Sequence, residues 1–324
     1  MMRSNILDLL RKAGDEYISG EEIASKLGVS RTAVWKHIKE LKQAGYLIDS
    51  HSRSGYSLKA TPDLLLPGEI ENGRKTKVLG NVVKYYKSVL STNNEAKKLA
   101  AQGAADGTII VSEEQSTGRG RLSRGWYSPA GKGIWFTIIL RPNFLPQEAP
   151  KCTLMAAVAL AKAIKKFGLD VGIKWPNDIL YEGKKLVGIL TEMNAEMDRV
   201  NYIIIGMGIN VNIARDDFPD EIKDLATSFS IMKGERLPRL KILNELLYEL
   251  ENLYEKAQTD GFVPILEEWK KYSVTLGQEV NVIGINETFA GKAVDIDDDG
   301  ALLVETTAGI RRVLAGDVSI RPRK

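Results

Sequence analysis

Two strongly apolar segments flank a stretch rich in glycine and arginine, and this order constrains the fold more than any other feature of the sequence. Residues 108–112 (TIIVS) and 133–140 (GIWFTIIL) are nearly continuous apolar runs, which is typical of strands buried in a core. Between them, three arginines and three glycines share the eight positions from 118 to 125. We therefore expect a loop with fixed ends and a mobile middle, whose backbone amides and guanidinium groups can close over phosphate or carboxylate. An ordinary Arg/Gly-rich surface loop would have the same composition.

Length and composition indicate a globular protein of several domains. A chain of 324 residues predicts two or three domains, and 44% hydrophobic with 27% charged residues is typical of a soluble protein with a real core. No apolar run is long enough to span a bilayer and the N-terminus lacks a signal-peptide pattern, so we expect a cytoplasmic protein.

Cysteine and histidine are too scarce for several kinds of chemistry. The single cysteine, Cys152, excludes an internal disulfide, and it begins an apolar helical stretch in which a packing role is expected. The two histidines, His37 and His51, both lie near the N-terminus, which argues against structural zinc and against histidine catalysis in the rest of the chain.

The first sixty residues predict a winged helix-turn-helix domain. Helices are expected over residues 4–13, 19–27 and 31–44, the second opened by a capping box and the third capped by Ser30. The alternating segment 46–58 then reads as a two-stranded wing.

Charge is distributed in a way that points to DNA. Residues 1–60 carry ten Lys/Arg against seven Asp/Glu, whereas the remaining 264 residues carry 35 of each sign. We expect the exposed face of the third helix and the wing tip to contact DNA, although a solvated helix face or a protein contact would use similar residues. The candidates are Arg31, Thr32, Lys36, Lys39 and Arg53. Trp35 and His37 are expected to pack against the wing or at its edge.

Two prolines mark residues 61–67 as a linker, and a second domain is expected from residue 68. Its helix 91–99 should begin with a capping box made by Thr92 and Glu95. Further strands are predicted over 82–87, 171–174, 184–192 and 200–210, and helices over 150–167, 239–257 and 261–272. Short alternating strands over 279–283, 289–295, 301–305, 311–314 and 317–320 predict a small barrel.

Lys174 is the most informative single residue of the second domain. It closes a short strand whose apolar neighbours should bury it, and a buried lysine normally has an anionic partner. Trp175 and Pro176 then turn the chain and present Asn177 and Asp178. Glycines at 206 and 208 would let a ligand approach the backbone. Because no Rossmann or P-loop fingerprint is present, ATP would have to bind in another way.

In combination, these motifs resemble the bacterial bifunctional biotin protein ligases that also repress the biotin operon. The resemblance rests on the helix-turn-helix motif and on segments 91–93, 118–121, 174–178, 185–190 and 206–210, and it covers essentially the whole chain. It implies an α+β multidomain fold. A winged helix-turn-helix domain would span residues 1–60, a central α/β catalytic domain resembling class II synthetases with a mixed β-sheet 68–274, and an SH3-like β-barrel 275–324.

The same resemblance implies the activity. Members of the family join biotin to ATP, with Mg²⁺, to form biotinyl-5'-AMP and pyrophosphate, and then transfer biotin to a lysine of a biotin carboxyl carrier protein. They also bind operator DNA as a homodimer when the adenylate is bound, and they need no membrane.

The family roles can be carried over to matching positions. Biotin would be bound by Ser91, Thr92, Asn93, Gln115, Arg119, Gly120, Arg121 and Lys174, of which Arg121 and Lys174 would be catalytic. Trp126, Asn177, Asp178 and Asn210 would contact the adenylate, with Mg²⁺ near Asp178, although no direct metal motif is present. The family loop often has another basic residue after its second arginine. This chain has Leu122 and Ser123, so the roles of those positions are not carried over.

Two other functions remain open from the sequence. A biotin-sensing repressor without catalysis would share the architecture, but the presence of Arg119, Arg121 and Lys174 favours an active enzyme. A lipoate or octanoate ligase would share the central domain, but the Gly/Arg loop and the N-terminal domain favour biotin.

Overall fold

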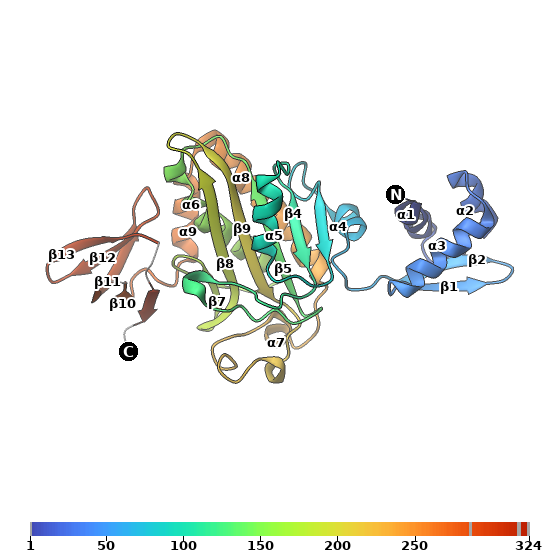
Figure 1. Cartoon of the computed structure of the whole chain (residues 1–324). Helices are drawn as coiled ribbons and strands as arrows, with labels where there is room; N and C mark the ends of the chain where they lie inside the picture. Colours follow the sequence, from blue (N-terminus) through green and yellow to red (C-terminus); the bar gives the residue numbers. More distant parts are fainter. Residues whose placement is uncertain (1, 285–286, 316–318, 323–324) are drawn as a thin grey trace. The chain divides into compact units, whose positions relative to one another are not determined.

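A computed structural model describes residues 2–284, 287–315 and 319–322 (Figure 1). By its internal contacts the chain divides into two compact units, Met1–Leu64 and Leu65–Lys324. The second unit contains both the central sheet and the C-terminal strands, and the sequence-based boundaries at 67/68 and 274/275 stay predictions.

The first unit is the predicted winged helix-turn-helix. Its helices are α1 (Met2–Ala13), α2 (Gly20–Leu27) and α3 (Arg31–Gln43), followed by the antiparallel pair β1 (Leu47–His51) and β2 (Gly55–Ala60). The Ser19 hydroxyl accepts the N–H of Glu22 at 3.0 Å, and the Ser30 hydroxyl accepts that of Ala33 at 3.2 Å. These side-chain caps fix where α2 and α3 begin.

The wing is fastened to the segment before α2 by a two-way backbone bridge. Ile18 and Tyr56 exchange N–H to C=O bonds of 3.0 and 2.9 Å. A Cβ at Gly55, whose φ is +105°, would lie 2.1 Å from the Ile18 carbonyl oxygen, so only glycine fits there.

The prediction for Trp35 was wrong. Its side chain is 55% exposed and does not pack against the wing, because the inward stripe of α3 is already filled by Val34, Ile38 and Leu41. His37 is half-buried and its Nδ1 lies 3.1 Å from Glu40 Oε2, a contact that lowers the pKa of the Glu40 carboxyl.

In the described part of the second unit, seven strands form a mixed sheet in the order β3-β4-β5-β9-β8-β7-β6 (Figure 1). Only the β3–β4 pair is parallel. The strands are β3 (Val83–Tyr86), β4 (Ile109–Ser112), β5 (Gly133–Leu140), β6 (Gly172–Lys174), β7 (Asp178–Tyr181), β8 (Lys184–Ala195) and β9 (Val200–Asn210). As expected, β4 and β5 are buried along their whole length and adjacent, so the Gly/Arg loop joins two core strands.

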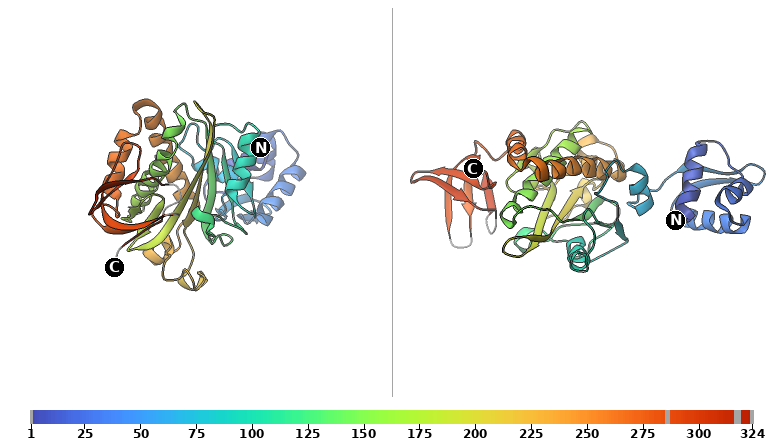
Figure 2. Two further views of the ribbon diagram at one scale, coloured as in Figure 1. Left: turned by 60° about the vertical axis from the view of Figure 1, so that its left-hand side comes forward. Right: turned by 90° about the horizontal axis from the view of Figure 1, so that it is seen from above.

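Helices cover the two faces of this sheet unequally (Figure 2). The main core lies between one face and α6 (Lys151–Lys165), α8 (Arg239–Asp260) and α9 (Val263–Tyr272), and it contains Cys152, whose thiol pKa is raised by burial. On the other face, α5 (Thr92–Ala101) packs its alanines against β4, β5 and β9. Short helices α4 (Pro67–Gly73) and α7 (Phe229–Lys233) were not predicted. The 3₁₀ turns are η1 (Arg121–Ser123), η2 (Pro146–Glu148) and η3 (Arg215–Asp217).

The predicted capping box of the helix at 91–99 was wrong. Ser91 is the N-cap residue, without a side-chain cap bond, and Thr92 is the first helical residue. The Thr92 hydroxyl lies 3.1 Å from Gln115 Oε1 instead, so a tertiary contact has replaced the local one.

A buried ion pair joins the roots of the Gly/Arg loop. Glu113, directly after β4, pairs with Arg239 at the start of α8 at 2.8 Å. The Glu113 carboxylate also accepts the N–H of Leu65 at 3.0 Å, while Arg239 donates to the carbonyl of Gly133 at 3.0 Å. Both roots of the loop and the first residue of the second unit are thus held by one pair of charges.

The C-terminal strands form the expected small antiparallel domain. Among the described residues its sheet has the order β13-β12-β11-β10-β14. The strands are β10 (Glu279–Ile283), β11 (Thr288–Ile296), β12 (Leu302–Thr306), β13 (Gly309–Val313) and β14 (Ser319–Pro322). The start of the last predicted strand, 317–318, lies outside the described residues. Trp175 Nε1 donates to the Gly300 carbonyl at 3.0 Å and Lys151 Nζ to that of Asp298 at 3.0 Å, which fastens this sheet to the central one.

Candidate active site

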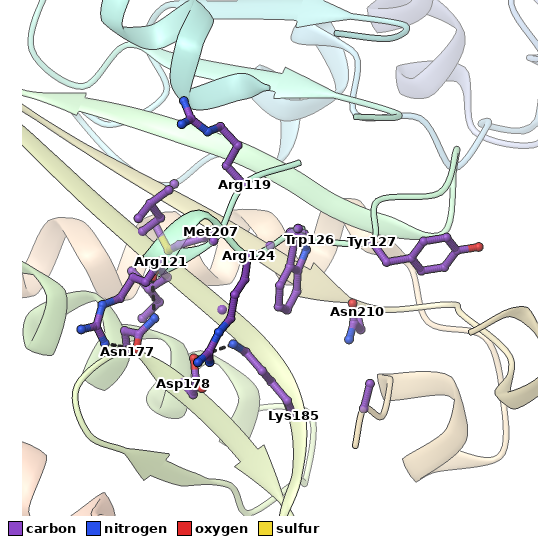
Figure 3. Close-up of a pocket in the computed structure, with 18 of the residues that line it drawn as sticks. Arg119, Arg121, Arg124, Trp126, Tyr127, Asn177, Asp178, Lys185, Met207 and Asn210 are labelled. Carbon is purple, nitrogen blue, oxygen red and sulfur yellow. Dashed lines mark hydrogen bonds and ion pairs between the residues drawn. The ribbon is translucent and has the colours of Figure 1, made fainter. Parts of the chain in front are cut away.

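One pocket of about 330 Å³ collects all the ligand-binding residues predicted in the second unit (Figure 3). It lies where the start of α5, the Gly/Arg loop, the β6–β7 turn and strands β8 and β9 meet. Its predicted members are Ser91, Thr92, Asn93, Gln115, Arg119, Gly120, Arg121, Trp126, Lys174, Asn177, Asp178 and Asn210. The structure therefore brings these residues together, while the role of each stays a prediction.

One wall of the pocket is polar and uncharged. Gln115 Oε1 accepts the backbone N–H of Thr92 at 2.9 Å, and its Nε2 donates to Ser128 Oγ at 2.9 Å. The Thr137 hydroxyl lies 2.8 Å from Thr92 Oγ1 and 2.7 Å from Asn93 Oδ1. These bonds hold the donors and acceptors of the wall in fixed directions.

Ser91 is the free member of this wall. Its side chain is buried but lines the pocket, and within the described ranges its hydroxyl makes no hydrogen bond to protein. A ligand with a polar head group would give it a partner.

The Gly/Arg loop is folded back on itself above this wall. The Trp126 N–H donates to the Gly118 carbonyl at 2.8 Å, and the Gly120 N–H donates to that of Arg124 at 2.8 Å. Leu122 and Ser123 between them have positive φ values of 54° and 57°, which are unfavourable for residues with a side chain.

The loop arginines point in different directions (Figure 3). Arg121 donates to Asn177 Oδ1 at 3.0 Å and to the carbonyl of Ala315 in the C-terminal sheet. Arg124 extends toward Asp178 and Lys185, whereas Arg119 points the other way, 3.4 Å from Asn94 Oδ1. Only Arg121 and Arg124 reach the side of the pocket that holds Lys174 and Lys185.

Lys174 is a half-buried cation opposite the loop. It pairs with Asp178 in the β6–β7 register across a cis Trp175–Pro176 bond. The expected carboxylate partner is absent: within residues 2–284, 287–315 and 319–322, Lys174 Nζ makes no hydrogen bond or ion pair, because Asp178 pairs with Lys185 at 2.7 Å. Burial lowers the pKa of Lys174, which attraction by Asp178 opposes and the charge of Lys185 reinforces.

Charge is therefore strongly one-sided in this pocket. Lys174, Lys185, Arg121 and Arg124 line it, and Asp178 is the one carboxylate among its described lining residues. Such a surface binds anions.

Glycines in β8 and β9 let two side chains lie against the sheet. A Cβ at Gly208 would be 2.1 Å from Trp126 Nε1, and one at Gly206 would be 1.9 Å from Asn93 Oδ1. Lys185 Nζ lies 5.1 Å from the centre of a Trp126 ring, on which it stacks. The close approach expected of a ligand is thus made here by Trp126 and Asn93.

Comparison with known proteins places the chain in a family. It is 46% identical over 320 residues to the "Bifunctional ligase/repressor BirA" of Bacillus spizizenii, with 98% of each chain covered. The Escherichia coli K12 protein of the same name is 30% identical over 95% of this chain and 94% of its own. The chain belongs to the bifunctional ligase/repressor BirA family.

The parts of this BirA-family chain match separately as well. Residues 85–210 match the model of the "Biotin/lipoate A/B protein ligase family", 3–57 an "HTH domain" and 275–321 the "Biotin protein ligase C terminal domain". A solved structure of Aquifex aeolicus biotin protein ligase in complex with biotin and ATP is 29% identical, with a TM-score of 0.67, and covers 75% of this chain and 100% of its own.

Sequence reasoning missed part of the pocket of this BirA-family protein. Lys185 and Arg124 were seen as motif members without a role. The wall formed by Phe218, Ile222, Leu225 and Ala226 was not predicted, because the segment after β9 has no strand or helix period. Lys132 pairs with Asp217 at 2.5 Å and holds one end of that segment.

The residues predicted to contact DNA lie in the first unit and are all exposed. They are Arg31, Thr32, Lys36, Lys39 and Arg53. As in the rest of the described chain, no helix of that unit is long and apolar enough to cross a membrane.

Proposed function

We propose that this protein activates biotin with ATP and transfers it to a lysine of a biotin carboxyl carrier protein. The observation that carries the proposal is one pocket in which a fixed, uncharged polar wall faces a group of cations. Its family membership supports the same substrates, since the similar proteins are named as ligase/repressors and biotin protein ligases.

In the first step, a carboxylate oxygen of biotin attacks the α-phosphorus of ATP. The bond between the α-phosphorus and the bridging oxygen breaks, and pyrophosphate leaves with biotinyl-5'-AMP as the other product. Because two anions must approach each other, the main requirement is fixed positive charge rather than acid/base groups. Lys174 meets it best, because its ammonium group has no protein partner in the described chain.

The uncharged wall suits the head group of biotin. That head group is a neutral cyclic urea with two N–H donors and one carbonyl acceptor. Ser91, Thr92, Asn93 and Gln115 supply matching hydroxyl and amide groups, and the bonds among them hold those groups in place before a ligand arrives. The carboxylate at the other end of biotin would then lie toward Lys174 and Arg121.

The loops protect the product. An acyl phosphate anhydride hydrolyses if water reaches it, so the site must be covered after the first step. The Gly/Arg loop with Arg119, Gly120 and Arg121 would cover the adenylate from one side. Trp126 and the segment containing Phe218 would cover the adenine.

Mg²⁺ fits the pocket only as a companion of ATP. The described residues contain no cluster of three possible metal ligands, and Asp178 is their one carboxylate in the pocket. Since Mg²⁺ usually binds through one or two carboxylates and substrate phosphates, Asp178 would hold it, with Asn177 and Asn210 nearby. The ion would neutralise charge on the phosphates.

In the second step, the amine of the carrier lysine attacks the carbonyl carbon of the adenylate. The carbon–oxygen bond to AMP breaks, an amide forms, and AMP and a proton are released.

The first unit gives the protein a regulatory role in the same proposal. A helix-turn-helix with exposed Arg31, Thr32, Lys36, Lys39 and Arg53 would bind operator DNA in the cytoplasm. Adenylate-dependent pairing of two copies would place two such units on a two-fold-symmetric operator. Sedimentation with and without biotin plus ATP tests this, and an unchanged sedimentation coefficient would contradict it.

Pyrophosphate release tests the enzyme proposal directly. Release should require both biotin and ATP, and a tenfold excess of lipoate over biotin should not reduce it. Absence of biotin-dependent release, with biotin still bound in calorimetry, would leave a sensor without ligase activity.

A further inference from the structure

Trp35 is exposed in the middle of the charged face of α3. The face consists of residues 32, 35, 36 and 39, which follow the i, i+3, i+4, i+7 spacing of one helix stripe. Arg31 lies one turn before Trp35 and Lys39 one turn after it, with Lys39 Nζ 5.5 Å from the centre of the Trp35 ring.

The fold itself gives no reason for a tryptophan at this position. Val34, Ile38 and Leu41 already form the inward stripe of α3, and the Trp35 side chain is 55% exposed. Leaving a large aromatic surface in water forgoes the favourable burial that such a ring provides. A partner that covers the ring would recover it.

The surrounding charges identify that partner as duplex DNA. An apolar protein surface would have to strip water from Arg31, Lys36 and Lys39 without neutralising them, which is costly. Phosphates on the two walls of a major groove would pair with those cations. The groove is about 12 Å wide and admits a helix, so a residue at the centre of the exposed stripe faces the base edges.

We propose that Trp35 is a sequence-reading residue that packs its indole ring against the C5-methyl group of a thymine in the operator. The indole ring offers a large apolar surface, and the thymine methyl is the apolar group that the major groove presents. The flanking cations then position the helix on phosphates, while Trp35 supplies discrimination between sequences. This inference rests on the proposed DNA-binding function of the first unit.

The test uses the full-length protein with biotin and ATP present. Duplexes enriched from a random pool by the wild-type protein serve as the probe, and their thymidines are replaced one at a time by deoxyuridine, which lacks only the methyl group. At one position in each half-site, replacement should weaken wild-type binding about 5- to 10-fold, the lower end of the effect of a changed base pair. Trp35→Ala should bind the unmodified duplex about as weakly and be insensitive to deoxyuridine.

Lys36→Ala is the matched control on the same stripe. It should weaken binding to enriched and random duplexes alike and reduce the slope of log K against log salt by about one. Trp35→Ala should leave that slope and random-sequence binding unchanged. Trp35→Gln, which keeps a long side chain without the ring, should behave like Trp35→Ala, and unchanged biotin-dependent pyrophosphate release shows that both variants are folded.

Each outcome decides between the possibilities. Equal weakening by Trp35→Ala on enriched and random duplexes would overturn the proposal and make Trp35 a backbone contact, and wild-type affinity in the variant would overturn it outright. If Lys36→Ala also binds like the wild type, or if no duplex is enriched, the DNA-binding function itself fails together with the proposal. Loss of deoxyuridine sensitivity in Trp35→Ala alone would confirm it.

Discussion

Lys174→Met should abolish adenylate formation without unfolding the protein. The lysine faces the pocket with no protein anion bound to Nζ in the described chain. A unit charge about 4 Å from an anion, at an effective dielectric constant of about 20, contributes about 4 kcal/mol, which is about 1000-fold in rate if it acts only in the transition state. Since part of this attraction is already present in bound substrates, we expect kcat to fall between about 100- and 1000-fold.

Stability should change in the opposite direction. Burial lowers the pKa of Lys174 below its ordinary value of 10.5, so the protonated form is less favourable in the folded than in the unfolded chain. This destabilisation is complete below the folded pKa and disappears as the pH rises to 10.5. Lys174→Met should therefore be at least as stable as the wild type in urea at pH 7, with the difference shrinking toward alkaline pH.

The assay is pyrophosphate release at saturating biotin and ATP. Lys162→Met is the control, because Lys162 is also a partly buried lysine but pairs with Glu249 and Glu268 at 3.6 and 3.3 Å and does not line the pocket. It should keep wild-type turnover. A kcat for Lys174→Met within about threefold of the wild type would refute the role of this charge.

Three further variants test other parts of the structure. Arg121→Gly removes the guanidinium that bonds Asn177, so a chase experiment should show biotinyl-5'-AMP dissociating about 10-fold faster, and an unchanged rate would contradict this. Gly206→Ala would place a Cβ 1.9 Å from Asn93 Oδ1, so calorimetry should show biotin binding about 10-fold weaker; wild-type affinity would mean that the Asn93 network does not hold biotin. Glu113→Gln leaves a buried cation without its anion, so urea unfolding should show about 3–5 kcal/mol less stability, and a loss below about 1 kcal/mol would count against the buried pair.

Local signals in the sequence were sufficient for the first unit. Ser30 caps α3 through its own side chain, and Gly28 ends α2 in the left-handed conformation, as the sequence indicates. Such features depend on neighbours a few residues away, so they can be read without knowing the tertiary structure.

Where long-range contacts compete with local ones, the predictions failed. Thr92 has the spacing of a capping box, but Gln115, twenty-three residues later, takes its hydroxyl. Trp35 looked like a packing residue because it is aromatic, although its helical position places it outside. In both cases the residue type was informative and the partner was not.

Lys174 shows the same limit inside the pocket. Its burial was predicted from the apolar strand around it, but the carboxylate expected to pair with it is taken by Lys185 from the neighbouring strand. Lys185 is adjacent only because β7 and β8 pair in a particular register, which no local pattern specifies. The Phe218 wall was missed for the same reason, since its position depends on how a segment without regular structure packs.

The buried Glu113–Arg239 pair limits the routes by which ligand occupancy could affect DNA binding. It clamps both ends of the Gly/Arg loop and also the backbone of Leu65, where the chain enters the second unit. Rearrangement of residues 118–125 is thereby mechanically isolated from that entry point, because a displacement would have to break a charged contact inside the core before it reached Leu65. Information about biotin is then carried outward by the new surface that the loop presents to another molecule, rather than by tension along the polypeptide.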